Sequence, residues 1–340
     1  MRWLCQVLPC FILIAHGSKL PLSPKLLSSR SIRYSLLAAQ AVAAWTVSPV
    51  RGEVIPSREE IYANYPYQRP TDLLRFVESY SSEGDAKSVL FAMDRFAEAY
   101  PMYKLSPTKA SILVRSVKSS QPKRVLEIGS FFGYSAIHIA QTMPGDCLLC
   151  CIEGNPENAE IARMLLQRSF ANKNSILERV KIVTGLSSDV LHGEDSCDRL
   201  FRGTSINGNN FRSSALEEFD FVFLDHDKNC YLPDLITMEE KLLLNPRRCT
   251  IVADNVIFPG APDFLRYVGI DEGYLKSLSF DVELPTSIVI DSGAWKSRIV
   301  EVPFERVGFE TQYRVKQDGM SISSRVYMPS IANFVLSELD

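Results

Sequence analysis

The sequence VLEIGSFFGYS, residues 125–135, joins a short apolar strand to a helix through a turn with two glycines. The strand is expected at Arg124–Ile128 and suits burial on both faces, and the helix is expected from Tyr134. A strand, a glycine-containing turn and a helix in this order are typical of α/β proteins that bind a ligand at the carboxyl ends of parallel strands.

Similar units continue along the chain. Further apolar strands are expected at Cys147–Ile152, Val180–Val183, Phe221–Leu224 and Thr250–Ala253, with a helix at Pro156–Phe170. Three helices are expected before the first strand, at Thr71–Tyr80, Ala86–Tyr100 and Pro107–Val117. Repeated strand-helix units predict an α/β fold with a mainly parallel, doubly wound sheet.

The C-terminal part has a different pattern. The runs 311–316 and 320–327, joined through Gln317-Asp318-Gly319, predict a β-hairpin that turns at Asp-Gly and adds an antiparallel edge to the sheet. A polar stretch near 192–216 predicts a surface insertion between strands. A second insertion is expected near 275–309, where the strand-like runs Ser287–Ile290 and Arg298–Val302 have no assigned place.

The first 52 residues differ in composition from the rest. They contain no Asp or Glu and six Lys and Arg, and their apolar run 3–15 is shorter than the roughly 20 residues that span a bilayer. We expect residues 1–52 to be a cleaved targeting leader for a plastid, a mitochondrion or the secretory pathway, with a retained membrane anchor as the alternative. Residues 53–340 would then form a single domain.

The charge balance bears on the kind of partner. The chain has 37 Lys and Arg against 40 Asp and Glu, a formal net charge of -3, and removing the six basic residues of the leader would make it -9. A protein that grips nucleic acid through its phosphates needs a basic excess. We therefore expect a small-molecule partner, no nucleic acid and no stable protein partner. Monomer and homodimer stay open.

Cysteines cluster at Cys147, Cys150 and Cys151. A single C-x-x-C pair without a second pair or a nearby histidine indicates zinc only weakly, and this one lies in a strand-like apolar run. We interpret these residues as buried thiols.

Three features of the first two strands indicate S-adenosylmethionine. The turn carries Gly129 and Gly133, which would let the backbone approach a ligand, but Phe131 replaces the middle glycine that a pyrophosphate requires. Glu127 and Phe131 offer a carboxylate and an aromatic face to a cationic ligand. Glu153 ends the second strand, where an acid binds ribose hydroxyls in adenosine cofactors.

A second group of polar residues follows two other strands. Asp225 and Lys228 come after Phe221–Leu224, and Asp254 and Asn255 come after Thr250–Ala253. Two carboxylates and an amide are hard oxygen ligands of the kind that suits Mg²⁺. Each acid alone would be read as a helix cap or a solvated strand end, but two at one sheet edge favour a metal site.

These motifs closely resemble the catechol O-methyltransferases. The resemblance runs from about Leu73 to Val268 and rests on five segments, in chain order Glu127–Ser135, Phe223–His226, Tyr231–Asp234, Ala253–Ile257 and Pro259–Phe264. It implies a Rossmann-like class I methyltransferase fold with a seven-stranded sheet, S-adenosylmethionine and Mg²⁺ as cofactors, and methyl transfer to one hydroxyl of a small catechol.

The resemblance also implies roles for single residues. The metal ligands would be Asp225, Asp254 and Asn255, the catalytic base Lys228, and the substrate contacts Lys228, Asn255 and Gln312. The cofactor site would take in Leu105, Glu127, Gly129, Phe131, Gly133, Ser135, Glu153, Gly154, Gly185, Ser187 and Asp225. His226, between the metal aspartate and the lysine, is interpreted as structural.

Departures from the family concern the substrate. Asp227 stands where the family has a tryptophan against the catechol ring, and the resulting Asp-x-Asp-Lys order resembles caffeoyl-coenzyme-A methyltransferases, which act on phenylpropanoid catechols. The family's late glutamate falls at Gln312, with Glu310 nearby. A phenylpropanoid O-methyltransferase is therefore the alternative. From other classes, a non-catalytic S-adenosylmethionine-binding protein is opposed by the intact site residues, and an RNA methyltransferase by the lack of a basic patch.

Overall fold

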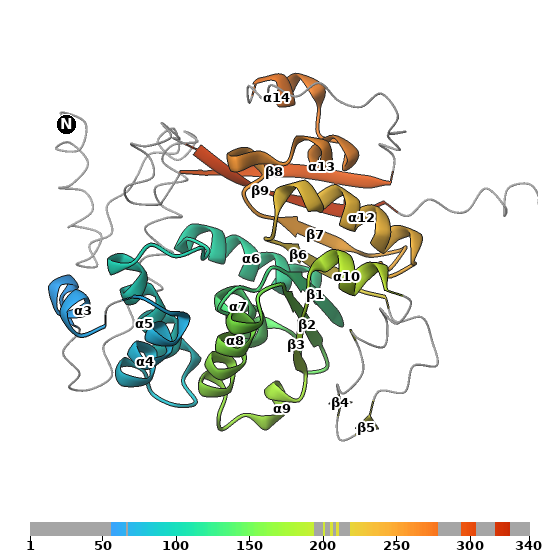
Figure 1. Cartoon of the computed structure of the whole chain (residues 1–340). Helices are drawn as coiled ribbons and strands as arrows, with labels where there is room; N and C mark the ends of the chain where they lie inside the picture. The colour runs from blue at the N-terminus through green and yellow to red at the C-terminus, as the bar shows by residue number, and fades with distance from the viewer. Residues whose placement is uncertain are drawn as a thin grey trace, which may run out of the picture. The chain divides into compact units, whose positions relative to one another are not determined.

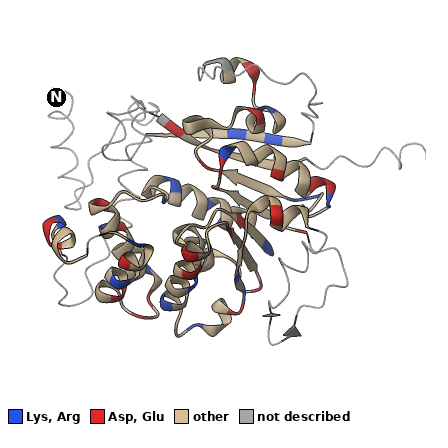
Figure 2. Cartoon of the chain, viewed as in Figure 1, with Lys and Arg blue, Asp and Glu red and all other residues tan. Residues whose placement is uncertain are grey.

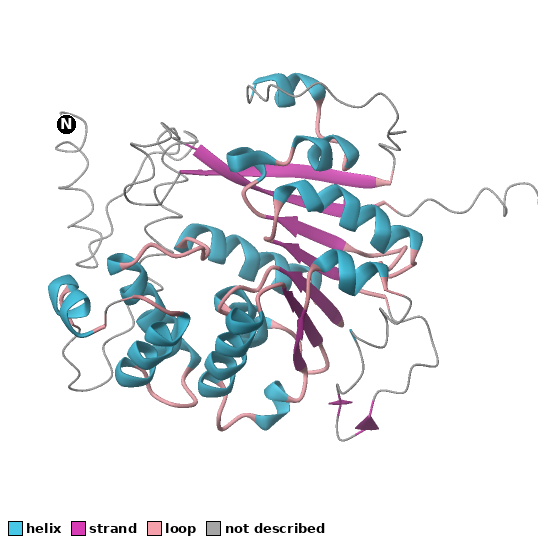
Figure 3. Cartoon of the chain, in the orientation of Figure 1, coloured by secondary structure: helices cyan, strands magenta, loops and turns pink. Residues whose placement is uncertain are grey.

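Seven strands form one twisted sheet at the centre of the fold (Figures 1 and 3). The computed structural model describes residues 56–65, 67–193, 200, 205–206, 209–210, 218–277, 294–303 and 317–326. Across the sheet the strands follow the order β3 (Val180–Thr184), β2 (Leu148–Glu153), β1 (Arg124–Ile128), β6 (Phe221–Leu224), β7 (Thr250–Ala253), β9 (Gln317–Arg325) and β8 (Trp295–Pro303). The first five are parallel and the last two antiparallel, which confirms the predicted sheet.

The strands β1, β2, β6 and β7 are buried on both faces of the sheet because they are apolar at nearly every position. Leu126 and Ile128 of β1 point to the face whose core also holds Val222 and Leu224 of β6. The intervening Glu127 points to the other face, beside Cys151 of β2 and Phe223 of β6. A carboxylate within this buried layer is the exception to the apolar pattern, and it lies near the end of its strand.

Helices cover both faces (Figure 1). On one side lie α6 (Pro107–Ser120), α7 (Tyr134–Thr142) and α8 (Pro156–Ser169), with α4 (Pro70–Tyr80) and α5 (Ala86–Ala99) packed beside them. On the other lie α10 (Ser187–His192), α12 (Tyr231–Glu240) and α13 (Pro262–Tyr267). The remaining short elements are α9 (Asn174–Leu177), α14 (Glu272–Ser277), the 3-10 helix η2 (Lys228–Cys230), the π-type turn η3 (Val256–Gly260), and the separate strand pair β4 (Ser205–Ile206) and β5 (Asn209–Asn210).

Acidic and basic residues are mixed on the outer helices, as Figure 2 shows for α5 and α8. In α8, Glu160 and Arg163 form an ion pair one turn apart, with nitrogen and oxygen 3.0 Å from each other. This is the pattern of solvated helix surfaces. In the described part of the chain, no helix is long and apolar enough to cross a membrane.

One more helix precedes the first strand than we predicted. The additional helix, α3 (Arg58–Asn64), begins at a capping box in which Ser57 and Glu60 bind each other's backbone N–H groups. Only Ile61 of this helix is buried. A seven-residue helix with one buried residue gives little apolar periodicity, and its capping signal was the feature that could have found it.

The predicted Asp-Gly hairpin turn is wrong, although the antiparallel edge is confirmed. Asp318 and Gly319 lie inside β9, opposite Val302 and Glu301 of β8. Gly319 does not supply a turn: a Cβ at this position would lie 2.8 Å from the Ile257 side chain, so the glycine allows β9 to approach η3 closely. The predicted strand Arg298–Val302 forms part of β8.

Several predictions fall outside the described residues: the leader 1–52, the strand-like runs Ser287–Ile290 and Thr311–Lys316, and most of both insertions. Within the first insertion, Leu200 is buried in the core on the face of α10 and α12. The cysteines are buried as predicted, and all three are free thiols. Burial raises the pKa of Cys147 and Cys150 to about 12.

Candidate active site

A cleft lies at the carboxyl ends of β1 and β6. The turn after β1 forms one wall and the segment before α6 forms the other. The lining residues are Met93, Met102, Tyr103, Lys104, Leu105, Gly129, Ser130, Phe131, Phe132, Tyr134, Ser135 and Asp225. Five residues predicted for the cofactor therefore meet in one cleft: Leu105, Gly129, Phe131, Ser135 and Asp225.

The two turn glycines are both in positions where a side chain would meet a neighbouring segment. Gly129 has φ +92°, and a Cβ there would lie 2.5 Å from the backbone oxygen of Asp225. Gly133 has φ +79° at the start of α7, and a Cβ there would lie 3.2 Å from Ala162 of α8. Gly129, which follows β1, lines the cleft and lies against the backbone of Asp225, which follows β6. Gly133 is not among the lining residues and instead lets two helices pack closely.

Glu153 ties the end of β2 to the turn after β1. Its Oε2 accepts a hydrogen bond from the backbone N–H of Phe131 at 2.7 Å, and its Oε1 accepts one from Asn155 at 2.9 Å. Phe131 itself has φ +47°, an unusual conformation for this residue type, which the carboxylate helps to hold. Glu153 thus fixes the turn, and each oxygen retains a lone pair toward a ligand.

The other predicted cofactor residues follow β2 and β3. Gly185 donates its N–H to the Glu153 carbonyl at 2.9 Å, which brings the two strand ends together. A Cβ on Gly154 would lie 3.1 Å from the Leu186 side chain. Ser187 begins α10 immediately afterwards. Gly154, Gly185 and Ser187 therefore gather at the β2 and β3 ends, next to Glu153 and outside the residues that line the cleft.

Glu127 is a fully buried carboxylate. Burial raises its pKa to about 7; the nearby Ser135 hydroxyl and Cys151 thiol lower it, and Asp225 and Glu153 raise it further. Neither carboxylate oxygen makes a hydrogen bond of normal geometry within the described residues. Burial of a carboxylate without hydrogen bonds costs free energy. Glu127 is therefore a candidate for binding a positively charged or hydrogen-bonding ligand.

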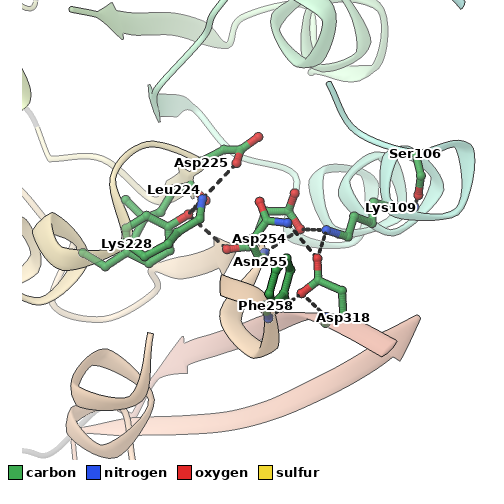
Figure 4. Close-up of polar contacts among 11 residues, drawn as sticks. Ser106, Lys109, Leu224, Asp225, Lys228, Asp254, Asn255, Phe258 and Asp318 are labelled. Carbon is green, nitrogen blue, oxygen red and sulfur yellow. Dashed lines mark hydrogen bonds and ion pairs between the residues drawn. The ribbon is translucent and has the colours of Figure 1, made fainter. Parts of the chain in front are cut away.

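The predicted metal residues meet at the ends of β6 and β7 (Figure 4). Asp254 is buried, and its Oδ1 accepts the backbone N–H of Asn255 at 2.7 Å. Asp225 is partly buried: desolvation raises its pKa to about 6, while Lys228 lowers it and Asp254 raises it. The negative charge of Asp254, at the end of the neighbouring strand, therefore disfavours ionisation of Asp225.

Lys228 lies against this pair of acids. Its Nζ is 3.1 Å from Asp225 Oδ1 and 2.7 Å from the Tyr231 hydroxyl oxygen. The hydroxyl of Tyr231 in turn donates toward the backbone oxygens of Leu224 at 2.8 Å and Asp254 at 3.0 Å. The buried Tyr231 thus links both strand ends to the lysine. Its own role was not predicted, although it begins the segment Tyr231–Asp234 that carries the family resemblance.

The oxygens present fit a hard divalent cation. The contacts above use Oδ1 of Asp225 and Oδ1 of Asp254, and the Nδ2 of Asn255 donates to Asp318 at 2.7 Å. One carboxylate oxygen of each acid and the amide oxygen of Asn255 are left as donors, the ligand type that Mg²⁺ prefers. Among the described residues no cluster of three His, Cys, Asp or Glu could hold a metal.

Two buried residues of the site were missed. Lys109 on α6 contacts both Asp254 and Asp318. Lys109 lay in an ordinary amphipathic helix and Asp318 in an apparent turn, so neither carried a motif. The one usable signal was a lysine in the first turn of a helix, where the helix dipole disfavours a cation.

The two residues that precede Lys228 make different contacts. His226, which we interpret as structural, has its Nε2 2.8 Å from Asp234 Oδ2, and its ring packs on Tyr231. Asp227 is exposed and caps η2 by accepting the backbone N–H of Asn229 at 3.0 Å. Gln312 and Glu310, predicted near the substrate, lie outside the described residues.

Comparison with known proteins agrees with this geometry. Residues 81–198 match the family described as "O-methyltransferase". The chain is 36% identical over 217 residues to catechol O-methyltransferase B of Danio rerio, covering 64% of this chain and 74% of that protein. It is 30% identical over 263 residues to catechol O-methyltransferase of Bos taurus, covering 76% and 85%. A solved O-methyltransferase from Bacillus cereus, in complex with SAH, aligns with 84% of this chain and 100% of that chain, with a TM-score of 0.46 and 18% identity.

The strand order, the helices on both faces and the family match define an S-adenosylmethionine-dependent methyltransferase of class I. Within that class the chain belongs to the O-methyltransferases, in the family of the catechol O-methyltransferases. The family resemblance of the sequence motifs is thereby confirmed. The roles of the single site residues stay predictions.

Proposed function

We propose that this O-methyltransferase transfers the methyl group of S-adenosylmethionine to one hydroxyl of a catechol in a Mg²⁺-dependent reaction. The observation that carries the proposal is the meeting of Asp225, Asp254, Asn255 and Lys228 beside the cleft after β1. Asp225 belongs to both groups, since it lines the cleft and contacts the lysine. A cofactor in the cleft and a substrate on the acids would therefore be neighbours.

S-adenosylmethionine would supply an activated methyl group on a positively charged sulfur. For this cofactor, the carboxylates of Glu127 and Asp225 offer negative charge to the sulfonium, and Phe131 offers an aromatic face. Glu153 would bind the ribose hydroxyls with the lone pairs that its backbone contacts leave. The other residues of the predicted cofactor site are Leu105, Gly129, Gly133, Ser135, Gly154, Gly185 and Ser187.

Mg²⁺ would act as a Lewis acid that favours ionisation of a coordinated phenolic hydroxyl. Asp225, Asp254 and Asn255 would hold it through their free carboxylate and amide oxygens. The requirement for a catechol follows from this arrangement, because two adjacent hydroxyls can bind one cation together.

Lys228 is the residue that would remove the proton. In its neutral amine form, its Nζ would accept the proton of the reacting hydroxyl, and its contacts with Asp225 and Tyr231 hold the side chain in place. Orientation would contribute further to the rate, since residues at the strand ends would hold the substrate oxygen close to the methyl group.

Two substrate classes follow from different observations. The relatives named as catechol O-methyltransferases support a small catechol. The exposed Asp227, in place of an aromatic residue against the ring, supports the larger phenylpropanoid catechols of the caffeoyl-thioester type. We propose small catechols as the main substrates. Gln312 would contact the second hydroxyl.

The test is a transfer assay with the purified protein and methyl-labelled S-adenosylmethionine. Catechol, a catecholamine, caffeate, a caffeoyl thioester and phenol would be assayed with Mg²⁺ and with EDTA. We expect label on one hydroxyl of a catechol, loss of transfer with EDTA and no transfer to phenol. An absence of Mg²⁺-dependent transfer to every catechol, or full activity in Asp254→Ala, would contradict the proposal.

We also propose that residues 1–52 are removed in the cell. The absence of acidic residues in this segment and its apolar stretches at residues 3–15 and 35–50 support a targeting leader. N-terminal sequencing of the protein from its native source tests this, since an N-terminus near residue 53 is expected and an intact Met1 would contradict cleavage.

A further inference from the structure

Lys109 occupies an unfavourable position on α6. It lies in the first turn of the helix, where the partial positive charge of the N-terminus disfavours a cation, and it is only 7% exposed. Its Nζ lies 2.6 Å from Asp254 Oδ1 and 2.6 Å from Asp318 Oδ2 (Figure 4).

Asp318 uses both oxygens of its carboxylate. Oδ2 accepts from Lys109 and, at 2.7 Å, from the Nδ2 of Asn255. Oδ1 accepts the backbone N–H groups of Phe258 at 3.1 Å and Gly319 at 2.7 Å. Four donors therefore fix a carboxylate that is 1% exposed. Its place inside β9, opposite Val302, prevents it from following any local movement of η3.

This anchoring decides how Asn255 presents its amide. Asn255 follows β7 with φ +55°, and an amide held on one side only can turn either its oxygen or its nitrogen toward a cation. Because the Asp318 carboxylate can accept but not donate, it binds the Nδ2 side. The amide oxygen must then face away from Asp318, and the reversed amide would set oxygen against oxygen.

We propose that Lys109 and Asp318 form a positioning pair that sets the divalent-cation affinity of the site by holding the Asn255 amide with its oxygen away from Asp318. Lys109 neutralises Asp318, so that this carboxylate serves as an anchor and does not compete for the cation. Neither residue touches a reacting atom. The inference rests on the proposed function, because it takes Asp225, Asp254 and Asn255 as the cation ligands.

The experiment measures Mn²⁺ binding to the full chain, by the electron paramagnetic resonance signal of free Mn²⁺, without any substrate. The test variant is Lys109→Met/Asp318→Leu, which replaces a buried ion pair by apolar groups of similar shape and leaves the net charge unchanged. We expect its Kd for Mn²⁺ to rise at least tenfold, with an unchanged Kd for S-adenosylmethionine. Equal Mn²⁺ affinity in a folded variant would overturn the inference.

The same double substitution in a protein that also carries Asn255→Ala tests whether the pair acts by positioning Asn255 or by disturbing the site in general. In Asn255→Ala the amide is absent, so the same double substitution can act only through the Lys109–Asp254 contact and should raise the Kd for Mn²⁺ clearly less than in the unsubstituted background. A further tenfold loss there would show that the pair does not act through Asn255. The charge-neutral swap Asp220→Leu/Arg248→Met serves as the control: it removes an ion pair between the buried Asp220 and the exposed Arg248 at the opposite end of β6 and should leave Mn²⁺ affinity unchanged.

A measurement on the unsubstituted protein covers the case in which the variant does not fold. A crystal structure with Mn²⁺ should place the Asn255 oxygen on the metal and its Nδ2 on Asp318. An amide bound in the opposite sense, or turned away from Asp318, would refute the inference and leave the proposed methyl transfer intact. If the unsubstituted protein binds no Mn²⁺, the inference and the metal part of the proposed function both fail.

Discussion

The Nζ of Lys228 lies 2.7 Å from the hydroxyl oxygen of Tyr231, and this contact links the candidate base to the ends of two strands. The hydroxyl hydrogen of Tyr231 points toward the backbone oxygens of Leu224 and Asp254, which leaves the oxygen to accept from the lysine. Burial, reinforced by the neighbouring aspartates, raises the pKa of Tyr231 well above its usual value, so it remains a neutral hydroxyl. Tyr231 therefore holds the Lys228 side chain against the ends of β6 and β7.

Replacement of the lysine should abolish proton removal while preserving the binding sites. We expect Lys228→Met to lower kcat by about 10²- to 10⁴-fold, the usual contribution of a general base, with little change in the Kd for S-adenosylmethionine. Steady-state kinetics and calorimetric titration would measure the two quantities. A kcat within threefold of the original would exclude Lys228 as the base.

Removal of the tyrosine hydroxyl should have a smaller effect of the same kind. Tyr231→Phe keeps the buried ring that packs on Phe264 and His226 but removes the acceptor for Lys228. The loss of one hydrogen bond, about 1 kcal/mol, corresponds to a roughly fivefold lower kcat. In Lys228→Met the tyrosine change should add nothing further, and an additive effect in the double variant would disprove the positioning role.

The turn after β1 should not tolerate a side chain at Gly129. A Cβ there would meet the backbone oxygen and carbon of Asp225 at 2.5 and 2.7 Å, and φ is +92°. Because backbone atoms of a neighbouring strand cannot move aside, we expect Gly129→Ala to lower the free energy of unfolding by about 3 kcal/mol. Urea denaturation measures this.

Gly145→Ala is the matched control for that experiment, because nothing lies within 4 Å of the added Cβ. It should change the free energy of unfolding by less than about 0.5 kcal/mol. Similar destabilisation in both variants would mean that the backbone at Gly129 does not lie so close to the backbone of Asp225.

Stability should fall in acid because of His138. Burial, with a further contribution from Lys104, lowers the pKa of His138 to about 3 in the folded protein. Between about pH 3 and its usual pKa near 6.5, the unfolded chain binds a proton that the folded chain does not. This contribution to stability is therefore complete above pH 6.5 and is lost as the pH falls.

The size of this effect is measurable by comparison with His138→Phe, which retains an aromatic ring beside Tyr134. Between pH 7.5 and pH 5.0 the original protein should lose about 2 kcal/mol more unfolding free energy than the variant. Urea denaturation at the two pH values provides the test. An equal loss in both proteins would mean that His138 is not buried as a neutral imidazole.

The sequence was sufficient for the parts of the fold that depend on local pattern. The strands β1, β6 and β7 have the predicted bounds because each is a short apolar run followed by a glycine, an acid or an asparagine. The acids that follow β6 and β7 were recognised because each comes directly after such a run. Residues at the carboxyl ends of parallel strands lie at the same edge of the sheet.

Long-range pairings were not accessible in this way. Lys109 and Asp318 are 209 positions apart, and only the docking of β9 beside η3 brings them together. The Asp-Gly pair misled because the same dipeptide suits a turn and a close approach of two backbones. Glu127 was recognised as a cofactor residue, but its complete burial depends on the helices that cover the sheet.

The participation of Asp318 gives the site a place late in the folding of the chain. Contacts between residues far apart in sequence form slowly, since a long loop must close before they provide any stabilisation. A folding intermediate with β1, β2, β3, β6 and β7 assembled would hold Asp225, Asp254 and Lys228, yet Asn255 would lack its anchor. If these residues bind a cation as proposed, full affinity would appear only when the antiparallel edge has docked, and cation binding would report completed folding.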